Sequence, residues 1–322
     1  MSTGFEKYLL DVTNASDCTE VLKIQSLWSG YGKISRYELQ NSTFQTVVVK
    51  SIKLNELTNH PRGWNTATSH NRKVRSYEVE THWYTHWNHR CNDSCRVPHF
   101  VGSYSEGRNQ WIILEDLNHL FPVRKIQVSV SEVKLCLKWL ANFHALFLNH
   151  KPEGLWPIGT YWHLETRPDE FNQLQNLDLK AKAHKLDRML NDCTFQTIVH
   201  GDAKLANFCF SGDGTSVAGV DFQYVGGGCG MKDVVYLIGS CFSSDECELY
   251  EHELLEFYFS ELQKAVAAQS MEIEFAALEM EWRNLYPIAV TDFTRFMLGW
   301  MPTHQKVNNY HLKHMQSVLT KL

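Results

Sequence analysis

The chain has 322 residues, more than one hydrophobic core usually covers, so two domains or lobes are expected. Hydrophobic residues make up 43% and charged residues 21%, which excludes disorder, collagen and coiled coil as overall descriptions. The 31 Lys and Arg are outnumbered by 36 Asp and Glu, and the formal charge of -5 argues against a nucleic-acid-binding surface.

The cysteine count and the N-terminus predict a reduced, cytoplasmic protein. Nine cysteines are an odd number, and a chain of this length does not need disulfides to fold. The first residues contain no basic segment followed by an apolar one, so no secretory signal is expected. No run reaches the roughly 18 uninterrupted apolar residues of a membrane-spanning helix, and we expect no membrane span.

The first third of the chain predicts a β-rich lobe. Strand-like runs cover residues 22–28, 35–39 and 46–52, with a glycine turn at 29–32 and a polar turn at 40–43. Residues 55–71 are polar and contain Pro61 and Gly63, which predicts a loop. A helical pattern over residues 73–87 follows, and two further strands are expected at 99–104 and 110–117.

Beyond Leu117 the pattern becomes mainly helical. Ser129 and Glu132 form a capping box that predicts a helix over residues 133–150. Further helical patterns cover 169–190, 245–268 and 275–300, and Pro287 is expected to kink the last one. We therefore expect a bilobal α+β fold. Residues 1–115 would form an antiparallel β-sheet lobe with one main helix, and residues 116–322 a larger, mostly helical lobe.

The segment from residue 200 to residue 233 contains the most informative pattern. Residues 208–210 and the run that begins at Val217 are strand-like, and the residues between them favour a turn. A hairpin that pairs Ser211 with Val217 would place Asn207 opposite Asp221. Asp202 lies on the turn just after a strand-like run, five residues before Asn207.

These three polar side chains suit phosphoryl transfer. The amide oxygen of Asn207 and the carboxylate of Asp221 suit a Mg2+ ion held mainly by phosphates and water. Asp202 is placed to act as the base that accepts a hydroxyl proton. Each residue alone is more simply interpreted as a turn cap or a strand end, but the three together at this spacing favour catalysis.

The motifs HGDAKLAN and VDFQ resemble the aminoglycoside-phosphotransferase and choline-kinase group of protein-kinase-like folds. Within that group the chain looks most like the ecdysteroid-kinase-like small-molecule kinases. The resemblance implies an ATP- and Mg2+-dependent kinase with Asp202 as the catalytic base and Asn207 and Asp221 as metal ligands. It also implies that His200 shapes the loop and that a buried Asp233 braces it, although Asp233 could simply start a helix.

The resemblance implies a phosphate-anchoring lysine on a strand and a glutamate on a helix that pairs with it. Lys50 fits the strand position, with Lys53 as the alternative, and Glu80 fits the helix position, with Glu78 as the competitor. Taken alone, such residues are usually a solvated strand end and a surface carboxylate. ATP is the expected nucleotide, and GTP is the alternative.

Two weaker patterns complete the expected nucleotide site. Gly30 and Gly32 precede the Lys50 strand and would form a phosphate-binding flap, or only a hairpin turn. The backbone from Glu115 to Leu117 matches the family hinge that would bind adenine, or it is only a strand end.

The acceptor is expected to be a small hydroxyl compound. A protein kinase is the second choice, because Gly201 replaces the arginine of H-R-D and only eleven residues, 222–232, separate Asp221 from Asp233. The GGGCG run at 226–230 indicates a flexible phosphate- or substrate-side loop. Asp292, with the aromatic residues of its helical stripe, would form a cage for an amine, or the aromatics pack in the core. A hydrophobic alcohol such as a sterol is equally compatible. The stripe consists of Trp282, Tyr286, Asp292, Phe296 and Trp300.

Two non-enzymatic alternatives remain open from the sequence. A cluster of His82, His86, His89, Cys91, Cys95 and His99 could bind structural zinc, but its spacing is loose and no second cysteine pair completes it. A pseudokinase that binds nucleotide without turnover is disfavoured, because the base, both metal ligands and a candidate lysine are all present.

Overall fold

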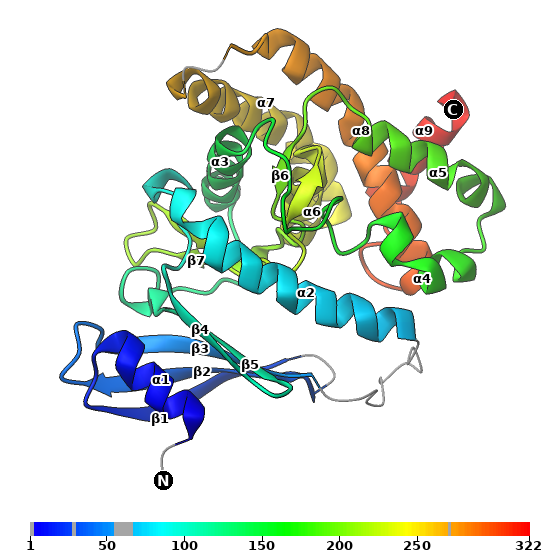
Figure 1. Ribbon diagram of the computed structural model, residues 1–322. Helices are drawn as coiled ribbons and strands as arrows, with labels where there is room; N and C mark the ends of the chain where they lie inside the picture. The colour runs from blue at the N-terminus through cyan, green and yellow to red at the C-terminus, as the bar shows by residue number, and fades with distance from the viewer. Residues whose placement is uncertain (1–2, 28–29, 55–66, 270–271) are drawn as a thin grey trace. The chain divides into compact units, whose positions relative to one another are not determined.

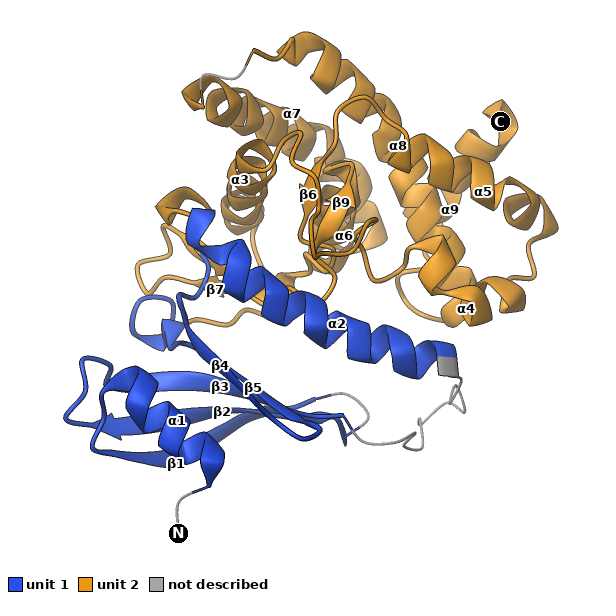
Figure 2. Cartoon of the chain, in the orientation of Figure 1, with its two compact units in different colours: residues 1–90, 97–122 blue, residues 91–96, 123–322 orange. Residues whose placement is uncertain are grey.

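The computed structural model describes residues 3–27, 30–54, 67–269 and 272–322 (Figure 1). Trp28, Ser29 of the expected glycine turn and residues 55–66 of the expected loop therefore lie outside the described residues. The chain divides into two compact units, residues 1–90 with 97–122 and residues 91–96 with 123–322 (Figure 2). The expected α+β class is confirmed, since the first unit contains an antiparallel sheet and the second is mainly helical.

The first unit is built on a five-stranded antiparallel sheet in the order β1-β2-β3-β5-β4. Its described elements are α1 (Gly4–Thr13), β1 (Asp17–Ser26), β2 (Gly32–Gln40), β3 (Thr46–Lys53), α2 (Ala67–His86), η2 (Asn88–Arg90), β4 (Phe100–Glu106), β5 (Asn109–Glu115) and η4 (Leu117–His119). The apolar side of α1 joins one face of the sheet in a core of Phe5, Leu9, Leu39, Val47, Val49 and Ile113. Our reading of the sequence did not predict α1, although Thr3 and Glu6 form a capping box at its start.

The described part of the second unit consists of helices around two short strand pairs, β6 with β9 and β7 with β8. Its described elements are η3 (Asp93–Cys95), α3 (Val130–Leu146), η5 (Leu164–Thr166), α4 (Pro168–Gln173), α5 (Leu177–Asn191), β6 (Thr197–Val199), η6 (Leu205–Asn207), β7 (Phe208–Phe210), β8 (Val217–Gly219), β9 (Gly226–Gly228), α6 (Met231–Cys241), α7 (Ser244–Ala268), α8 (Phe275–Trp300) and α9 (Asn309–Lys321). The capping box predicted at Ser129 is present at the start of α3.

One predicted helix of the second unit is wrong in its extent. The pattern over 169–190 is divided into α4 and α5, because Leu174 has an extended backbone and Asn176 caps the start of α5 through the backbone N–H of Leu179. In contrast, α8 continues through Pro287 as one helix.

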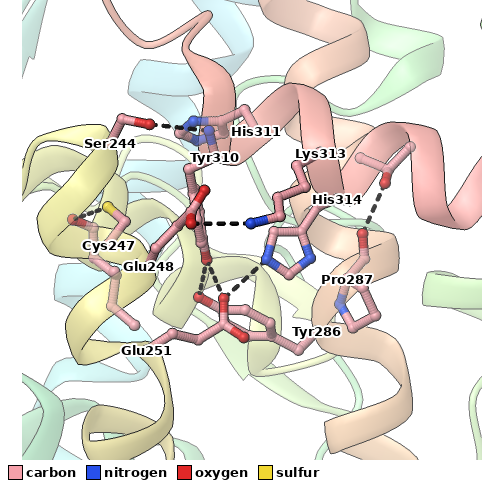
Figure 3. Close-up of polar contacts among 12 residues, drawn as sticks. Ser244, Cys247, Glu248, Glu251, Tyr286, Pro287, Tyr310, His311, Lys313 and His314 are labelled. Carbon is pink, nitrogen blue, oxygen red and sulfur yellow. Dashed lines mark hydrogen bonds and ion pairs between the residues drawn. The ribbon is translucent and has the colours of Figure 1, made fainter.

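The C-terminal helix α9, which the sequence patterns did not indicate, is fixed to α7 and α8 by a polar cluster (Figure 3). The Tyr310 hydroxyl donates to Glu251 at 2.7 Å and lies 2.7 Å from the Tyr286 hydroxyl. His314 Nε2 lies 2.9 Å from the same Glu251 carboxylate, and Lys313 forms an ion pair with Glu248. These contacts fix the first part of α9 against α7 and α8.

Two further observations concern the state of the cysteines and the apolar character of the helices. All nine cysteines lie within the described ranges, and each is a free thiol. Among the helices of the described residues, none combines the length and the apolar character needed to cross a membrane.

Candidate active site

The loop that follows β6 is held by a buried carboxylate at the start of α6. Asp233 accepts the backbone N–H of His200 at 2.6 Å and that of Gly201 at 2.9 Å. His144 Nε2 lies 3.1 Å from the same carboxylate, and its other ring nitrogen lies 2.8 Å from the Tyr258 hydroxyl. Asp233 and His144 have no exposed surface, so the loop is fixed from inside the unit.

Gly201 and His200 give the loop its shape. Gly201 has a φ of 81°, and a Cβ at this position would overlap the backbone carbonyl oxygen of Tyr224. Only glycine fits this combination of left-handed backbone and close approach. The buried His200 ring lies 3.0 Å from the Val220 carbonyl oxygen and accepts the Asp202 N–H through Nδ1 at 3.2 Å.

The hairpin register predicted for β7 and β8 is wrong by one residue. Phe210 pairs with Val217 and Phe208 with Gly219, so Asn207 lies opposite Val220 and not opposite Asp221. The reason is a tighter turn: the Ser211 hydroxyl accepts the backbone N–H of both Thr215 and Ser216, at 3.1 and 3.0 Å. These bonds remove one residue from the expected pairing.

The shifted register places Asp221 just beyond the paired part of the hairpin. It adopts a left-handed backbone with a φ of 70°, unusual for a residue other than glycine. Gln223 Nε2 donates to Asp221 Oδ1 at 2.6 Å and orients the carboxylate. Strain of this kind is typical of functional sites.

Asn207 is bound directly to Asp202. Its Nδ2 donates to the backbone oxygen of Asp202 at 2.8 Å and to Oδ2 of the Asp202 carboxylate at 3.0 Å. The amide nitrogen is therefore occupied by Asp202, and the amide oxygen of Asn207 faces the other way. Both side chains are buried.

Lys204, which the sequence patterns did not single out, lies close to the carboxylates of both Asp202 and Asp221. Its Nζ donates to Asp202 Oδ2 at 2.9 Å. Burial lowers the pKa of Lys204, but the carboxylates of Asp202 and Asp221 outweigh burial, and the net pKa is raised. The signal was present in the motif itself, since Lys204 lies between Asp202 and Asn207 in HGDAKLAN.

The donor set around Asp202 fits a hard cation. Asp221 offers carboxylate oxygens and Asn207 an amide oxygen, the ligand types that Mg2+ prefers in nucleotide sites. Nitrogen and sulfur ligands are not gathered in this way. The described residues contain no group of three or more His, Cys, Asp or Glu side chains that could hold a metal ion. The zinc alternative therefore has no site there, although the rings of His82 and His86 lie 4.3 Å apart.

The glycine run 226–230 is not the flexible loop that we expected. Gly226, Gly227 and Gly228 form β9, which pairs antiparallel with β6. A Cβ at Gly226 would overlap the carbonyl oxygen of Trp156, so the strand needs glycine for close backbone approach. The run is structural, and it supports the loop that carries Asp202.

In the first unit, Lys50 on β3 is paired with Glu80 on α2. Lys50 Nζ donates to both carboxylate oxygens of Glu80, at 2.9 and 2.6 Å, and both side chains are buried. Glu78, the competitor, instead forms an exposed ion pair with Arg75 at 3.2 Å. Lys53 lies at the exposed end of β3.

The glycine flap and the hinge also lie in the first unit. Gly30 and Gly32 have φ values of 75° and 140°, and a Cβ at Gly32 would overlap the Ser51 carbonyl oxygen. At the end of β5, the Glu115 carboxylate accepts the backbone N–H of His99 at 2.9 Å, and the buried Leu117 begins η4. Their nucleotide-binding roles stay predictions.

The residues expected to bind the acceptor are mostly occupied by internal contacts. The buried Asp292 accepts from Arg295 Nε at 2.8 Å, so this carboxylate already has a cationic partner. Trp282 has no exposed surface and donates to the Phe195 carbonyl oxygen at 3.0 Å, the position of a core residue. Trp300 stacks on Phe296 with ring centroids 5.7 Å apart. The proposed amine cage is thus not formed by Asp292 and Trp282.

Comparisons with known proteins give one family match and several similar solved structures. Three solved structures, all kinases or phosphotransferases, are similar at low identity. A Plasmodium vivax ethanolamine kinase is 12% identical, covering 96% of this chain and 85% of its own, with a TM-score of 0.49. An aminoglycoside phosphotransferase from Streptomyces rimosus, in complex with ADP and streptomycin, is 11% identical. The match covers 79% of this chain and 90% of that protein, with a TM-score of 0.43. A type VIII aminoglycoside-3'-phosphotransferase is 13% identical. The match covers 84% of this chain and 93% of that protein, with a TM-score of 0.42.

No curated protein shows significant sequence similarity to the chain. Residues 160–271, however, match the ecdysteroid kinase-like family. The matched segment contains Asp202, Lys204, Asn207, Asp221 and Asp233. The resemblance predicted from HGDAKLAN and VDFQ is therefore confirmed over this segment, which is similar to the ecdysteroid kinase-like family.

Proposed function

We propose that the protein is an ATP- and Mg2+-dependent phosphotransferase that moves the γ-phosphate of the nucleotide to a hydroxyl group of a small molecule. The observation that supports this best is the fixed position of Asp202, on a loop braced by Asp233 and in direct contact with Asn207 and Lys204. The family match over the same segment supports the same reaction class.

Asp202 is proposed as the base. Lys204 and Asn207 both bind Oδ2 of its carboxylate, so Oδ1 remains to accept the proton of the acceptor hydroxyl. Lys204 also holds positive charge beside the position where phosphoryl charge would develop. The Lys50–Glu80 pair is proposed as the phosphate anchor of the first unit.

Asn207 and Asp221 are proposed to hold Mg2+. When bound, the ion would neutralise negative charge on the nucleotide phosphates. Two hydrogen bonds orient these ligands: the amide nitrogen of Asn207 donates to Asp202, and Gln223 donates to the Asp221 carboxylate.

The segment between Asp221 and Asp233 favours a small acceptor over a polypeptide. Five of its eleven residues, 222–232, belong to regular structure, because 226–228 form β9 and α6 begins at Met231. That leaves too little chain for an activation segment that presents a peptide. The contacts of Asp202 with Asn207 and Lys204 and the buried Lys50–Glu80 pair support an active enzyme over a pseudokinase.

The test is an ATP-consumption screen across amino alcohols, sugars, aminoglycosides, sterols and hydroxy acids, with GTP in a parallel set. The blank is Asp202→Ala, which should lose acceptor-dependent turnover by ~1,000-fold or more while keeping the native circular dichroism spectrum. Asp213→Ala, an exposed aspartate on the turn of the same hairpin, is the matched control and should keep full activity. Full activity of Asp202→Ala would disprove the catalytic assignment.

A further inference from the structure

Two lysines of the second unit lie near Asp202. Lys204 is bound to its carboxylate, and Lys306, in the segment between α8 and α9, is close enough for the charges of Asp202 and Lys204 to act on it. Two other carboxylates of the unit are already paired, Asp292 with Arg295 and Glu170 with Arg167, and Asp221 is assigned to Mg2+ in the function proposed above. This distribution does not suit a cationic amine.

Lys306 is held in place by its own short segment. Its backbone N–H donates to His304 Nδ1 at 3.1 Å, and the next residue, Val307, donates to the His304 carbonyl oxygen at 2.8 Å. Polar contacts fix α9 just beyond it. The lysine is therefore part of an ordered turn.

Aromatic faces surround the ammonium group of Lys306. Nζ lies 4.4 Å from the ring centroid of Tyr236 and 5.8 Å from that of Phe293. Cation–π contacts of this kind stabilise a charge but leave its N–H donors unused. Within the ranges that the structure describes, Nζ has neither a hydrogen-bond acceptor nor an ion-pair partner. Burial lowers the pKa of Lys306 to about 8, which reflects this missing partner.

The same aromatic group reaches the proposed base. Tyr161 donates its backbone N–H to the Gly201 carbonyl oxygen at 3.1 Å, next to Asp202, and the rings of Tyr161 and Tyr236 lie 5.3 Å apart. Tyr161 continues to Phe296, also at 5.3 Å. Lys306 and Asp202 therefore flank one aromatic surface. Because Lys204 already binds the Asp202 carboxylate, Lys306 is left for another anion.

A partly buried ammonium group without an acceptor is unfavourable, and buried charges are normally paired. On the basis of the phosphotransferase function proposed above, we propose that Lys306 is a specificity-determining residue that binds an anionic oxygen group, a carboxylate, on the hydroxyl-bearing acceptor. The acceptor class is then a hydroxy acid with an apolar body, which would lie on the rings of Tyr161, Tyr236 and Phe296.

The experiment compares three probes that share one body: 4-(hydroxymethyl)benzoate, 4-methylbenzyl alcohol and 4-(aminomethyl)benzyl alcohol. Their dissociation constants are measured by ligand-observed NMR with the full chain, which does not require turnover. We expect the carboxylate to bind about tenfold more tightly than the neutral alcohol and the ammonium probe to bind most weakly. Lys306→Met should abolish the preference, Lys306→Arg should keep it and Lys306→Glu should reverse it.

The control is Lys313→Met, which removes an exposed lysine of α9 that is paired with Glu248 (Figure 3). It should leave the preference unchanged. The idea is overturned if wild-type protein binds the ammonium probe as tightly as the carboxylate, if no carboxylate binding occurs at millimolar concentration, or if the preference survives in Lys306→Met.

Two further measurements separate the possible sources of the anion and the two proposals. If Lys306 instead binds a nucleotide phosphate, Lys306→Met will weaken ADP or inorganic phosphate and not the carboxylate probe, which contradicts the acceptor role. Asp202→Ala should keep the carboxylate preference while losing turnover. A wild-type protein that shows the preference but never consumes ATP would refute the proposed function and leave the role of Lys306 in binding supported.

Discussion

Two buried aspartates of the second unit, Asp233 and Asp292, differ in what satisfies them. Asp233 accepts two backbone N–H groups and contacts His144, so its charge organises a loop. Asp292 is bound by Arg295, three residues along the same helix, so its charge is cancelled locally. A buried carboxylate thus contributes to a site only where its partners belong to that site.

The largest effect is expected for Asp233→Ala. Removing this carboxylate leaves two backbone N–H groups and a histidine without their partner in the interior. The free energy of unfolding should fall by about 3–5 kcal/mol. Turnover with any acceptor found in the screen should fall at least ~100-fold. Urea denaturation and ATP consumption measure the two losses. Unchanged turnover in folded Asp233→Ala would mean that this residue does not position Asp202.

Asp292→Ala should destabilise the protein by about 3 kcal/mol, because Arg295 then remains buried without its partner. The double variant Asp292→Leu with Arg295→Met should recover most of that loss, since an apolar pair needs no compensation. A double variant that makes both Asp233 and His144 apolar should not recover stability, because the backbone N–H groups of His200 and Gly201 would still lack their acceptor. Denaturation of the two Asp292 variants in parallel checks this, and a double variant as unstable as the single one would contradict local cancellation.

His311 on α9 shows a third way to treat a buried charge, which is to keep the group neutral. Burial, with help from Lys306 and His314, lowers the pKa of His311 to about 4 from its usual 6.5. The unfolded chain therefore binds more protons between these values. Stability from this group is complete above pH 6.5 and is lost as the pH falls toward 4, by on the order of 3 kcal/mol in total. Urea unfolding at pH 7 and pH 5 should show a smaller difference in His311→Gln than in wild type; an equal difference would contradict it.

The smallest effect concerns Lys306 itself. With its pKa at about 8, the ammonium form that would bind a carboxylate is lost above that pH. Asp202, Lys204 and Cys241 are the titratable groups whose charges act on Lys306, and Lys306 in turn acts on His311. The affinity for 4-(hydroxymethyl)benzoate should fall by up to about tenfold, the whole carboxylate preference, as the pH rises past 8, whereas that for 4-methylbenzyl alcohol should not. Parallel NMR titrations at pH 7 and pH 9 decide this, and Lys306→Arg should flatten the profile.

The sequence predicted what is local and missed what tertiary packing brings together. The α+β division and the family could be predicted because HGDAKLAN and VDFQ lie within 24 residues of one another. Asn207 binds Asp202 because both lie on one short loop. The hairpin register was wrong because it depends on one serine hydroxyl that closes a tight turn.

Other features were missed for reasons of distance or of close packing. Tyr161, Tyr236 and Lys306 come from a connector, a helix and a late turn, and no motif joins them. The strand formed by the glycine run requires Trp156 to lie against it, which composition does not indicate. The Asp292–Arg295 pair, by contrast, could have been predicted from its i,i+3 spacing on a helix.

The backbone at Gly201 also limits how this protein could change over evolutionary time. An arginine at this position, as in the H-R-D loop of protein kinases, would need a Cβ where the Tyr224 carbonyl oxygen lies and a side chain tolerant of a φ of 81°. No single substitution at position 201 can therefore introduce a phosphate-sensing arginine without rebuilding the neighbouring turn at Tyr224. The backbone geometry therefore rules out control of this protein by an arginine at position 201, and an engineered phosphorylation switch would need a different position.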